Sequence, residues 1–482
     1  MTPDQSISPS PLPDSSIGRR VRNGTTVVLG YGVSNRPLVG LLTGLGARVC
    51  VYDQKPPEVL GEEAVRDAQT GVRFFSDWES LPTRDVSVVF RSPGFRPDLP
   101  YIRAATESGA LLSSEMEWFL SVTPATVLGI TGSDGKTTTS TLTARMLEAA
   151  GHQVFLGGNI GTPLLCQVPR MRPEDYVVLE LSSFQLCSMG QAPLRSAITN
   201  LSPNHLNWHT GMEEYTQAKS RIYGPGCRYV VTNADNPITS ALAPHIPKEA
   251  ELVLFSSSGE PPAVLENGRA VSRRLWIRED VLVCREKNGD EIPLVPTRDI
   301  LLPARHNWEN IMTACGMVWG LASPDAMRQV ARTFPGVEHR LERVRTLHGV
   351  TYYNSSIDSS PTRTAAALSA IRQPMVVICG GYDKHIPFAP LADALCRHAR
   401  AVVLTGATAG AIDEALRFCP AFDPRVLTVV REPDFRSAVL RASSLARPGD
   451  AVLLSPACAS FDAFANFAER GRVFKDIVRQ LS

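Results

Sequence analysis

The sequence predicts an α/β protein with three domains, each built on an open and mainly parallel sheet. First, short apolar runs of strand length alternate with amphipathic helical patterns along most of the chain, which is typical of βαβ units. Second, a glycine-rich turn, GSDGKTT, joins one such strand to a helix. Third, the 482 residues exceed the roughly 250–300 residues at which one hydrophobic core stops growing.

The first domain is expected over residues 19–122, after a Pro- and Ser-rich segment, 1–18, that we interpret as a flexible tail. The strand TTVVLG, the turn GYGVSN and a leucine-faced helix lead into a second strand, ARVCVYD. This order predicts a Rossmann-like βαβ unit. Asp53 follows the turn at the spacing of a dinucleotide fingerprint, but Asn35 replaces the last glycine, so the turn argues only weakly for a dehydrogenase.

The central domain is expected over residues 123–335. The strand ATVLGI runs into TGSDGKTTTS and a helix, and DYVVLELSS, RSAITNLS and RYVVTNAD suggest further parallel strands. Ligands bind at the carboxyl edge of such a sheet. Residues 251–300 alternate around NGR and NGD, which favours hairpins, and a helix is expected over 306–322.

The third domain, residues 336–482, repeats the βα alternation and is predicted to be Rossmann-like. A helix follows Pro361, and the expected strands are PMVVICGG, AVVLTGA, RVLTVV and AVLLSPA.

Composition excludes several classes of protein. The 49 basic and 48 acidic side chains give no electrostatic reason to expect a nucleic acid or an anionic membrane as a partner. The ten cysteines form no CxxC pair or Cys/His cluster, so reduced cytosolic thiols are favoured over a zinc site or a disulfide framework. We see no signal peptide and no apolar run near the roughly 20 residues of a membrane span, and we expect a cytoplasmic protein without membrane insertion.

The glycine-rich turn has the features of a phosphate-binding loop. Its glycines let backbone amides approach phosphate oxygens, Lys136 adds positive charge, and Thr137 can reach Mg²⁺. Ile130 occupies the first glycine position of the usual GxxxxGK[ST] pattern, and a chance turn is disfavoured by the strand and helix on either side. The candidate ATP-binding residues here are Gly132, Ser133, Asp134, Gly135, Lys136, Thr137 and Thr138.

The segment GITGSDGKTT resembles the phosphate loop of the Mur ligases and the folylpolyglutamate synthetases. GGNIGTP, ELSSFQL, NLSPNH, QAKSRIY, LPARHNWEN and EHRLE are similar to motifs of that family and come in the same order. The resemblance extends over nearly the whole chain. It implies that the central domain is a P-loop-type ATPase and that the shorter glycine spacing is normal for the family.

A magnesium site is expected around Glu180. This residue ends an apolar run, VVLEL, where an unpaired carboxylate is costly unless a cation, an arginine or backbone groups compensate it. The resemblance implies that Glu180, His205 and Thr137 bind two magnesium ions. Taken singly, His205 is more often a loop histidine with a structural partner.

Lys219 shares one helix face with Met212, Tyr215 and Ile222, so it is expected to face inward. Burial favours a neutral amine, which can react with CO₂ to give a carbamate, an anion able to bind magnesium. The resemblance implies this modification. A lysine that extends to a surface carboxylate is the alternative.

Further nucleotide contacts are implied by the resemblance alone. Asn307 and Asn310 present amides to adenine, although helix capping is an alternative for Asn307. Arg340 contacts ATP phosphates, although a lone arginine is usually a surface charge. Asn159 and Lys136 orient the acyl phosphate.

Three positions depart from the family pattern. Ser355 stands where an acid is expected in YNSSIDSSPTRT, and Asp358 follows three residues later as a candidate replacement at the ATP site. Asn204 and Asn207 stand where aspartates are common. These changes remove charge near the expected metal site.

The outer domains resemble the branch of the family that adds D-glutamate to UDP-N-acetylmuramoyl-L-alanine, because GGYDKHIPF and SPACASFDAFANFAERG match it most closely. By that resemblance the glutamate is held by Ser359, Lys384, Ser460 and Phe467. The UDP substrate is held by Ser34, Asp53, Ser92 and Gly94, together with Asn159. Ordinary βα turns are the alternative for the first four of these.

The expected reaction is an ATP-dependent ligation through an acyl phosphate, which gives ADP and phosphate in peptidoglycan synthesis; a monomer is expected. One alternative is another ligase of the superfamily, such as a folylpolyglutamate synthetase or an L-glutamate-adding variant. A second is a non-catalytic paralogue that binds ATP or a UDP-sugar, suggested by the three lost acids.

Overall fold

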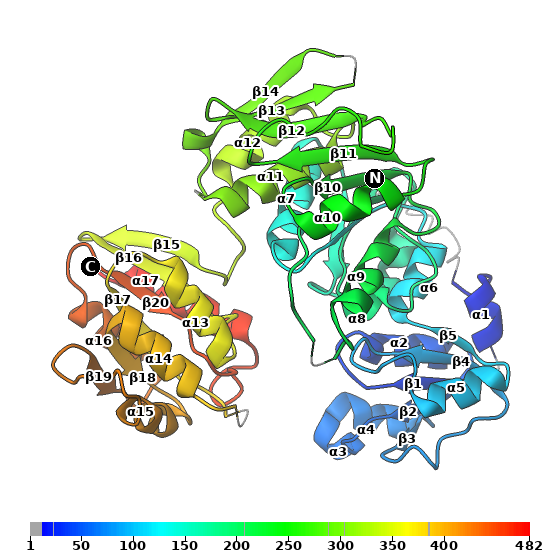
Figure 1. Ribbon diagram of the computed structural model, residues 1–482. Coiled ribbons are helices and arrows are strands. Elements are labelled where there is room, and N and C mark those ends of the chain that lie inside the picture. Colours follow the sequence, from blue (N-terminus) through cyan, green and yellow to red (C-terminus); the bar gives the residue numbers. More distant parts are fainter. Residues whose placement is uncertain (1–11, 23, 207, 288, 303, 384–385) are drawn as a thin grey trace, which may run out of the picture. The chain divides into compact units, whose positions relative to one another are not determined.

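The chain folds around three sheets (Figure 1). The structure is a computed structural model that describes residues 12–482 except 23, 207, 288, 303 and 384–385. Two compact units are present, Met1–Phe334 and Pro335–Ser482. The strands of each sheet are mainly parallel, so the predicted α/β class is confirmed.

The first sheet has five parallel strands in the order β3-β2-β1-β4-β5. Leu38, Val39 and Leu42 of the first long helix are buried, as expected for the apolar stripe of a helix that covers a sheet. The strands are β1 Thr25–Leu29, β2 Arg48–Tyr52, β3 Arg73–Phe75, β4 Val86–Arg91 and β5 Leu111–Ser113, and the helices are α2 Asn35–Gly44, α3 Pro57–Leu60, α4 Glu62–Gln69, α5 Pro100–Glu107 and α6 Glu115–Val122.

Residues 12–18 differ from the flexible tail that we expected. Leu12 and Ile17 are buried in the same apolar cluster as Trp118, and Ile17 belongs to the helix α1 Ser16–Val21. The Trp118 indole N–H donates to Ser15 Oγ at 3.0 Å. Two apolar side chains therefore anchor a Pro- and Ser-rich stretch, while residues 1–11 lie outside the described part of the chain.

The second sheet has nine strands in the order β14-β13-β12-β11-β10-β9-β6-β8-β7. The hairpins expected in this region are confirmed, because β12, β13 and β14 pair antiparallel; β11, expected among them, instead pairs parallel with β10. The strands are β6 Thr126–Thr131, β7 Val154–Gly158, β8 Tyr176–Glu180, β9 Arg195–Ile198, β10 Tyr229–Asn233, β11 Glu251–Ser256, β12 Arg273–Arg278, β13 Val281–Glu286 and β14 Glu291–Pro296.

The second sheet is flanked by helices that belong to the same compact unit (Figure 1). The helix expected over 306–322 is present but ends earlier, at Val318. The helices are α7 Lys136–Ala149, η1 Leu165–Arg170, α8 Ser183–Leu186, α9 Met212–Ser220, η2 Arg221–Tyr223, α10 Pro237–Leu242, η3 Ala243–His245, η4 Thr297–Asp299, α11 Arg305–Val318 and α12 Pro324–Thr333.

The second unit contains a six-stranded sheet in the order β15-β16-β20-β17-β18-β19. Its first two strands were not predicted, and β15 is the antiparallel one. The strands are β15 Glu342–Leu347, β16 Val350–Asn354, β17 Met375–Cys379, β18 Ala399–Leu404, β19 Thr428–Arg431 and β20 Ala451–Leu454, and the helices are α13 Pro361–Ala370, α14 Ala389–His398, α15 Ala409–Arg417, α16 Phe435–Leu445 and α17 Phe467–Gln480. Across the described residues of both units, every helix is too short or too polar to cross a membrane.

Candidate active site

Several predicted site residues meet at the carboxyl edge of the second sheet. The strands β9, β6, β8 and β7 are neighbours in that order and run parallel. Their carboxyl ends therefore lie along one edge, and the turn GSDGKTT, Glu180 and Asn159 follow β6, β8 and β7 there. This is the edge at which open α/β sheets bind ligands.

The carboxylate of Glu180 is the centre of this cluster. Its side chain is only 2% exposed, its Oε2 accepts from Thr137 Oγ1 at 2.7 Å, and its Oε1 accepts from Asn159 Nδ2 at 2.8 Å. No lysine or arginine among the described residues forms an ion pair with it, which removes the arginine alternative. A buried carboxylate with neutral donors only is suited to a hard cation such as Mg²⁺.

The phosphate loop needs its glycines for close packing. A Cβ on Gly132 would lie 1.9 Å from Thr199 Oγ1, and one on Gly135, whose φ is +77°, would lie 2.2 Å from Asn310 Oδ1. The loop leads directly into α7, a helix of 14 residues that begins at Lys136. Its N-terminal amides and the helix dipole favour a bound phosphate.

The ammonium group of Lys136 bends back over this loop. Its Nζ donates to the carbonyls of Gly132 at 3.0 Å and Ser133 at 2.8 Å. The positive charge of Lys136 is therefore held beside the backbone amides at the N-terminus of α7.

Lys219 faces inward from α9, as its helical position predicts. The side chain is 2% exposed, and its Nζ donates to Gly132 O at 2.8 Å and Thr131 Oγ1 at 3.1 Å. Burial holds the pKa of Lys219 well below the usual lysine value, and the positive charge of Lys136 lowers it further. The surface-directed alternative is therefore wrong, and the buried amine of Lys219 lies against the phosphate loop.

His205 lies on an exposed loop after β9, in the left-handed region with φ +56°. Its ring centroid is 4.9 Å from that of Phe184. Sequence reasoning missed a second histidine four residues later: His209 is buried, bonds Ser183 Oγ at 2.9 Å through Nε2, and has its pKa lowered by burial. The spacing of the two histidines was the available signal.

The two asparagines of LPARHNWEN occupy different environments. Asn310 is buried, and its Oδ1 accepts from Thr139 Oγ1 at 3.2 Å beside the loop glycine. Asn307 is the third residue of α11, whose N-cap is Ala304, so the capping alternative is excluded. Contact of either amide with adenine stays a prediction.

The predicted UDP-binding residues lie at the carboxyl edge of the first sheet. Asp53 accepts from the backbone amides of Tyr31 at 2.9 Å and Lys55 at 3.1 Å. Asn35, which replaces the fingerprint glycine, donates to Ser92 Oγ at 2.8 Å and Gly30 O at 2.9 Å. Its amide thus joins the turn after β1 to the loop after β4.

Two remaining UDP-site candidates differ in their contacts. Ser34 is the residue before α2, and its side chain makes no capping bond. Gly94 is exposed and accepts from the Trp208 indole N–H at 3.2 Å. The loop after β4 is therefore in direct contact with the segment that carries His205.

In the second unit, the ATP-site candidates differ sharply in exposure. Arg340 is exposed, whereas Asp358 is 7% exposed and accepts from Ser455 Oγ at 2.8 Å. Burial raises the pKa of Asp358. Ser355, at the position of the expected acid, is fully buried and accepts from the Leu341 amide at 3.1 Å, so it serves the local backbone.

The glutamate-site candidates are only partly described. Ser460 is 2% exposed and Phe467, the first residue of α17, is 40% exposed, while Ser359 follows Asp358 in the loop before α13. Lys384 lies outside the described residues. A cavity of about 400 Å³ in this unit includes Asp462, which lies between Ser460 and Phe467 in sequence.

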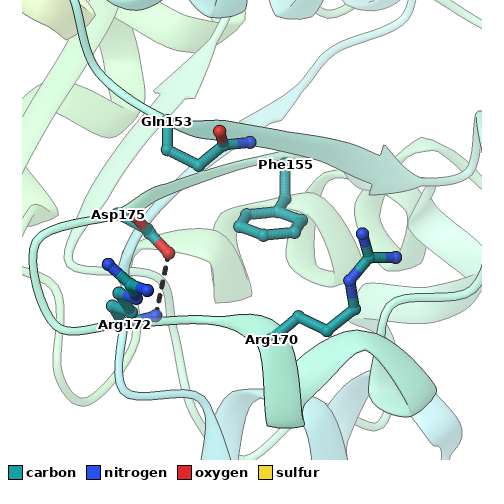
Figure 2. Close-up of a pocket in the computed structure, with 5 residues that line it drawn as sticks. All are labelled: Gln153, Phe155, Arg170, Arg172 and Asp175. Carbon is teal, nitrogen blue, oxygen red and sulfur yellow. Dashed lines mark hydrogen bonds between the residues drawn. The ribbon is translucent and has the colours of Figure 1, made fainter. Parts of the chain in front are cut away.

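Another cavity, of about 350 Å³, lies beside the amino-terminal half of β7 (Figure 2). The Phe155 ring projects into it from the strand, and Asp175 accepts from the backbone amide of Arg172 at 2.8 Å. The lining residues are Gln153, Phe155, Arg170, Arg172 and Asp175. None is a predicted site residue, so this cavity is separate from the cluster at the carboxyl edge.

Comparison with known proteins places the chain in a family. The Mur ligase middle domain matches residues 130–318, and the Mur ligase glutamate ligase domain matches residues 339–458. UDP-N-acetylmuramoylalanine–D-glutamate ligase of Clostridium novyi is 44% identical, over 96% of this chain and 98% of that protein. The ligase of the same name from Symbiobacterium thermophilum is 42% identical, over 94% and 98% of the two chains.

Solved structures support the fold. The UDP-N-acetylmuramate–alanine ligase of Thermotoga maritima is similar with a TM-score of 0.52 and 17% identity, over 95% of this chain and 99% of that one. A UDP-N-acetylmuramoyl-L-alanyl-D-glutamate–2,6-diaminopimelate ligase has a TM-score of 0.50 and 17% identity, over 84% and 94%. The chain therefore belongs to the Mur ligase family, and within it is similar over almost its full length to relatives named UDP-N-acetylmuramoylalanine–D-glutamate ligase.

Proposed function

We propose that this protein joins D-glutamate to UDP-N-acetylmuramoyl-L-alanine in peptidoglycan synthesis and converts ATP to ADP and phosphate. Direct amide formation is slow because a carboxylate would have to expel oxide. ATP first phosphorylates the L-alanyl carboxylate, and the amine of D-glutamate then attacks the acyl carbon and displaces phosphate. The near full-length likeness to ligases of this name supports the assignment. We further propose a cytoplasmic monomer.

The three domains divide the substrates among them. Residues 19–122 bind the UDP group, residues 123–335 bind ATP, and residues 336–482 bind glutamate. In the first, Ser34, Asp53, Ser92 and Gly94 face uridine and diphosphate. In the third, the glutamate carboxylates are held by Ser359, Lys384, Ser460 and Phe467.

The cluster at Glu180 fits magnesium. Among the described residues no cationic side chain forms an ion pair with the buried carboxylate, and the Thr137 hydroxyl donates to it. Glu180, Thr137, His205 and the carbamate of Lys219 hold two Mg²⁺ ions, which neutralise negative charge on the phosphates during transfer.

Lys219 is suited to carbamate formation. Burial favours the unprotonated form of its amine, whose nitrogen lone pair can form an N–C bond to CO₂ with loss of one proton. The product is a carboxylate-like anion at the position of Nζ, under the phosphate loop. Because the pKa of Lys219 is lowered, the unprotonated amine that reacts with CO₂ is present at lower pH than it is for an ordinary lysine.

The remaining side chains position the nucleotide and the acyl group. Lys136 and the N-terminus of α7 hold the terminal phosphates of ATP, and Asn159 with Lys136 orients the acyl phosphate. Asn307 and Asn310 contact adenine. Arg340 and Asp358 are further ATP-binding residues.

The observation that carries this proposal is the buried carboxylate of Glu180, which accepts hydrogen bonds from Thr137 and Asn159 and lies near the buried amine of Lys219, whose pKa is lowered by burial. The test is phosphate release by purified protein with UDP-N-acetylmuramoyl-L-alanine, ATP and Mg²⁺, comparing D-glutamate, L-glutamate and no amino acid. Release only with D-glutamate is expected. A preference for L-glutamate would change the substrate, and ATP binding without release would favour a non-catalytic paralogue.

A further inference from the structure

Arg91 is a buried cation that no part of the proposed mechanism uses. It is the last residue of β4 and is 2% exposed. Its neighbours in sequence, Ser92 to Phe95, form the loop that we assign to the UDP group. A buried guanidinium at this place calls for a physical explanation, because removing a charge from water is unfavourable unless partners compensate it.

The partners of Arg91 are neutral. Its Nη1 points to carbonyls of its own loop, Pro93 O at 3.2 Å and Phe95 O at 2.5 Å. Its Nη2 donates to Phe184 O at 2.7 Å and Ser188 Oγ at 2.8 Å. No carboxylate among the described residues forms an ion pair with the guanidinium, and its Nε is buried without an acceptor.

The hydrogen bonds from Nη1 of Arg91 fix the orientation of the backbone in the loop after β4. Because the carbonyls of Pro93 and Phe95 turn inward onto the guanidinium, polar groups on the other side of the loop remain available. Within the described part of the chain, the exposed Gly94 N–H has no acceptor. Such an amide, in a loop whose carbonyls are held by a buried guanidinium, is a candidate donor to a phosphate oxygen.

The second set of bonds reaches the central domain. Phe184 lies in α8, which begins three residues after Glu180, and Ser188 follows the end of that helix. The Phe184 ring lies 4.7 Å from Trp208 and 4.9 Å from His205 between ring centroids. The Arg91 side chain therefore connects the loop after β4, which we assign to UDP, with the α8 segment, which follows Glu180 of the proposed magnesium site.

Resting on the proposed function, we propose that Arg91 is a positioning residue that shapes the UDP-diphosphate loop and holds it in register with the catalytic centre. The guanidinium does this with two separate donor groups, Nη1 on the loop and Nη2 on the α8 segment. A lysine has one ammonium point and cannot reproduce both arms of the planar fork. The proposed role therefore requires the planar geometry of the guanidinium as well as its positive charge.

The test compares Arg91→Lys with wild type in two binding measurements, calorimetric titration with UDP and with ATP. UDP affinity is expected to fall about tenfold or more, with ATP affinity unchanged within twofold. Arg195→Lys is the matched control, since Arg195 also donates from a half-buried position to two carbonyls, Met317 O and Trp319 O, but at the amino end of β9. It should change neither affinity.

A second variant keeps the proposal testable if Arg91→Lys folds poorly. Ser188→Ala removes one acceptor of Nη2 and leaves the loop bonds intact, so kcat should fall several-fold while UDP affinity stays within twofold. Unchanged UDP affinity in Arg91→Lys, or equal losses for UDP and ATP, would overturn the role of Arg91. A wild-type protein that binds no UDP would overturn the proposed function as well.

Discussion

The two ends of the nine-stranded sheet differ in how deeply their ionisable side chains are buried and in whether these side chains form ion pairs. At β8 and α9, Glu180 and Lys219 are each 2% exposed and bond only neutral groups of the protein. At β12–β14, arginines and glutamates form ion pairs that are partly exposed to solvent, such as Arg285 with Glu260 at 2.7 Å and with Glu291 at 3.1 Å. Both regions belong to one unit and one sheet.

The difference indicates what each end is for. Surface ion pairs are screened by water and contribute little energy, so their loss is tolerated. A buried charge without an ionic partner is costly, and binding of a ligand of opposite charge offsets that cost. We therefore interpret the hairpin end as structural, and the β8 end as the one to which our proposal assigns cations and phosphates.

The largest expected effect comes from Lys219→Ala. Loss of the carbamate removes one anionic ligand of the metal cluster, and a cost of about 4 kcal/mol in the transition state lowers kcat about a thousandfold. Small carboxylic acids should restore part of the rate, because they can occupy the vacated position. The control is Lys287→Ala, an exposed lysine near the hairpins, which should have wild-type kcat. Full activity of Lys219→Ala would remove the carbamate from the mechanism.

Glu180→Gln should lower kcat about a hundredfold, since it keeps the shape and removes the charge. The Mg²⁺ concentration for half-maximal rate should rise at least tenfold by the same reasoning. Glu286→Gln is the paired control from the hairpin end, where the carboxylate lies 3.0 Å from Arg273, and it should leave both values unchanged. An unaltered Mg²⁺ dependence in Glu180→Gln would show that this carboxylate does not bind the metal.

Glu115, a buried carboxylate that lies outside both regions, gives a third case for the comparison. Burial raises the pKa of Glu115 in α6 from 4.5 to about 7, although it accepts from the Leu165 amide at 2.9 Å. The folded state thus binds a proton more tightly than the unfolded state, so its contribution to stability is present below about pH 4.5 and is lost as pH rises through 7. The free energy of unfolding of Glu115→Gln should therefore lack this decline, which is on the order of 3 kcal/mol over the full range of pH.

Denaturant unfolding of wild type and Glu115→Gln at pH 5, 6, 7 and 8 measures this contribution. The difference between the two proteins should shift in favour of the variant as pH rises. A difference that is constant with pH would mean that Glu115 keeps its charge in the folded protein.

The smallest effect is expected for Arg285→Ala at the hairpin end. Although it breaks two ion pairs, the cost in unfolding free energy should stay below about 1 kcal/mol, and kcat should stay within twofold of wild type. Thermal unfolding at low and high salt gives the measurement. A loss of several kcal/mol would contradict the view that these pairs are surface features.

Much of the site was readable from the sequence because its signals are local. The turn GSDGKTT carries its own glycines, and Glu180 ends an apolar strand, so their meeting at one sheet edge follows from parallel topology. The inward direction of Lys219 followed from helical spacing. The family resemblance then supplied roles that spacing alone left open.

Features that depend on distant contacts were missed. The strand β15, ERVRTL, carries three charged residues among its six and gave no apolar signal. Leu12 and Ile17 looked like tail residues because their partners, such as Trp118, are about a hundred positions away. Arg91 bonds residues more than ninety positions along the chain, and nothing in RSPGF predicts that.

The most direct test of the central claim follows the oxygen atoms of the substrate carboxylate. UDP-N-acetylmuramoyl-L-alanine labelled with ¹⁸O in the alanyl carboxylate is incubated with the protein, ATP, Mg²⁺ and D-glutamate, and the released phosphate is analysed by mass spectrometry. Phosphorylation of the carboxylate predicts one ¹⁸O in each phosphate and one retained in the new amide. Unlabelled phosphate alongside product would contradict an acyl phosphate at this site.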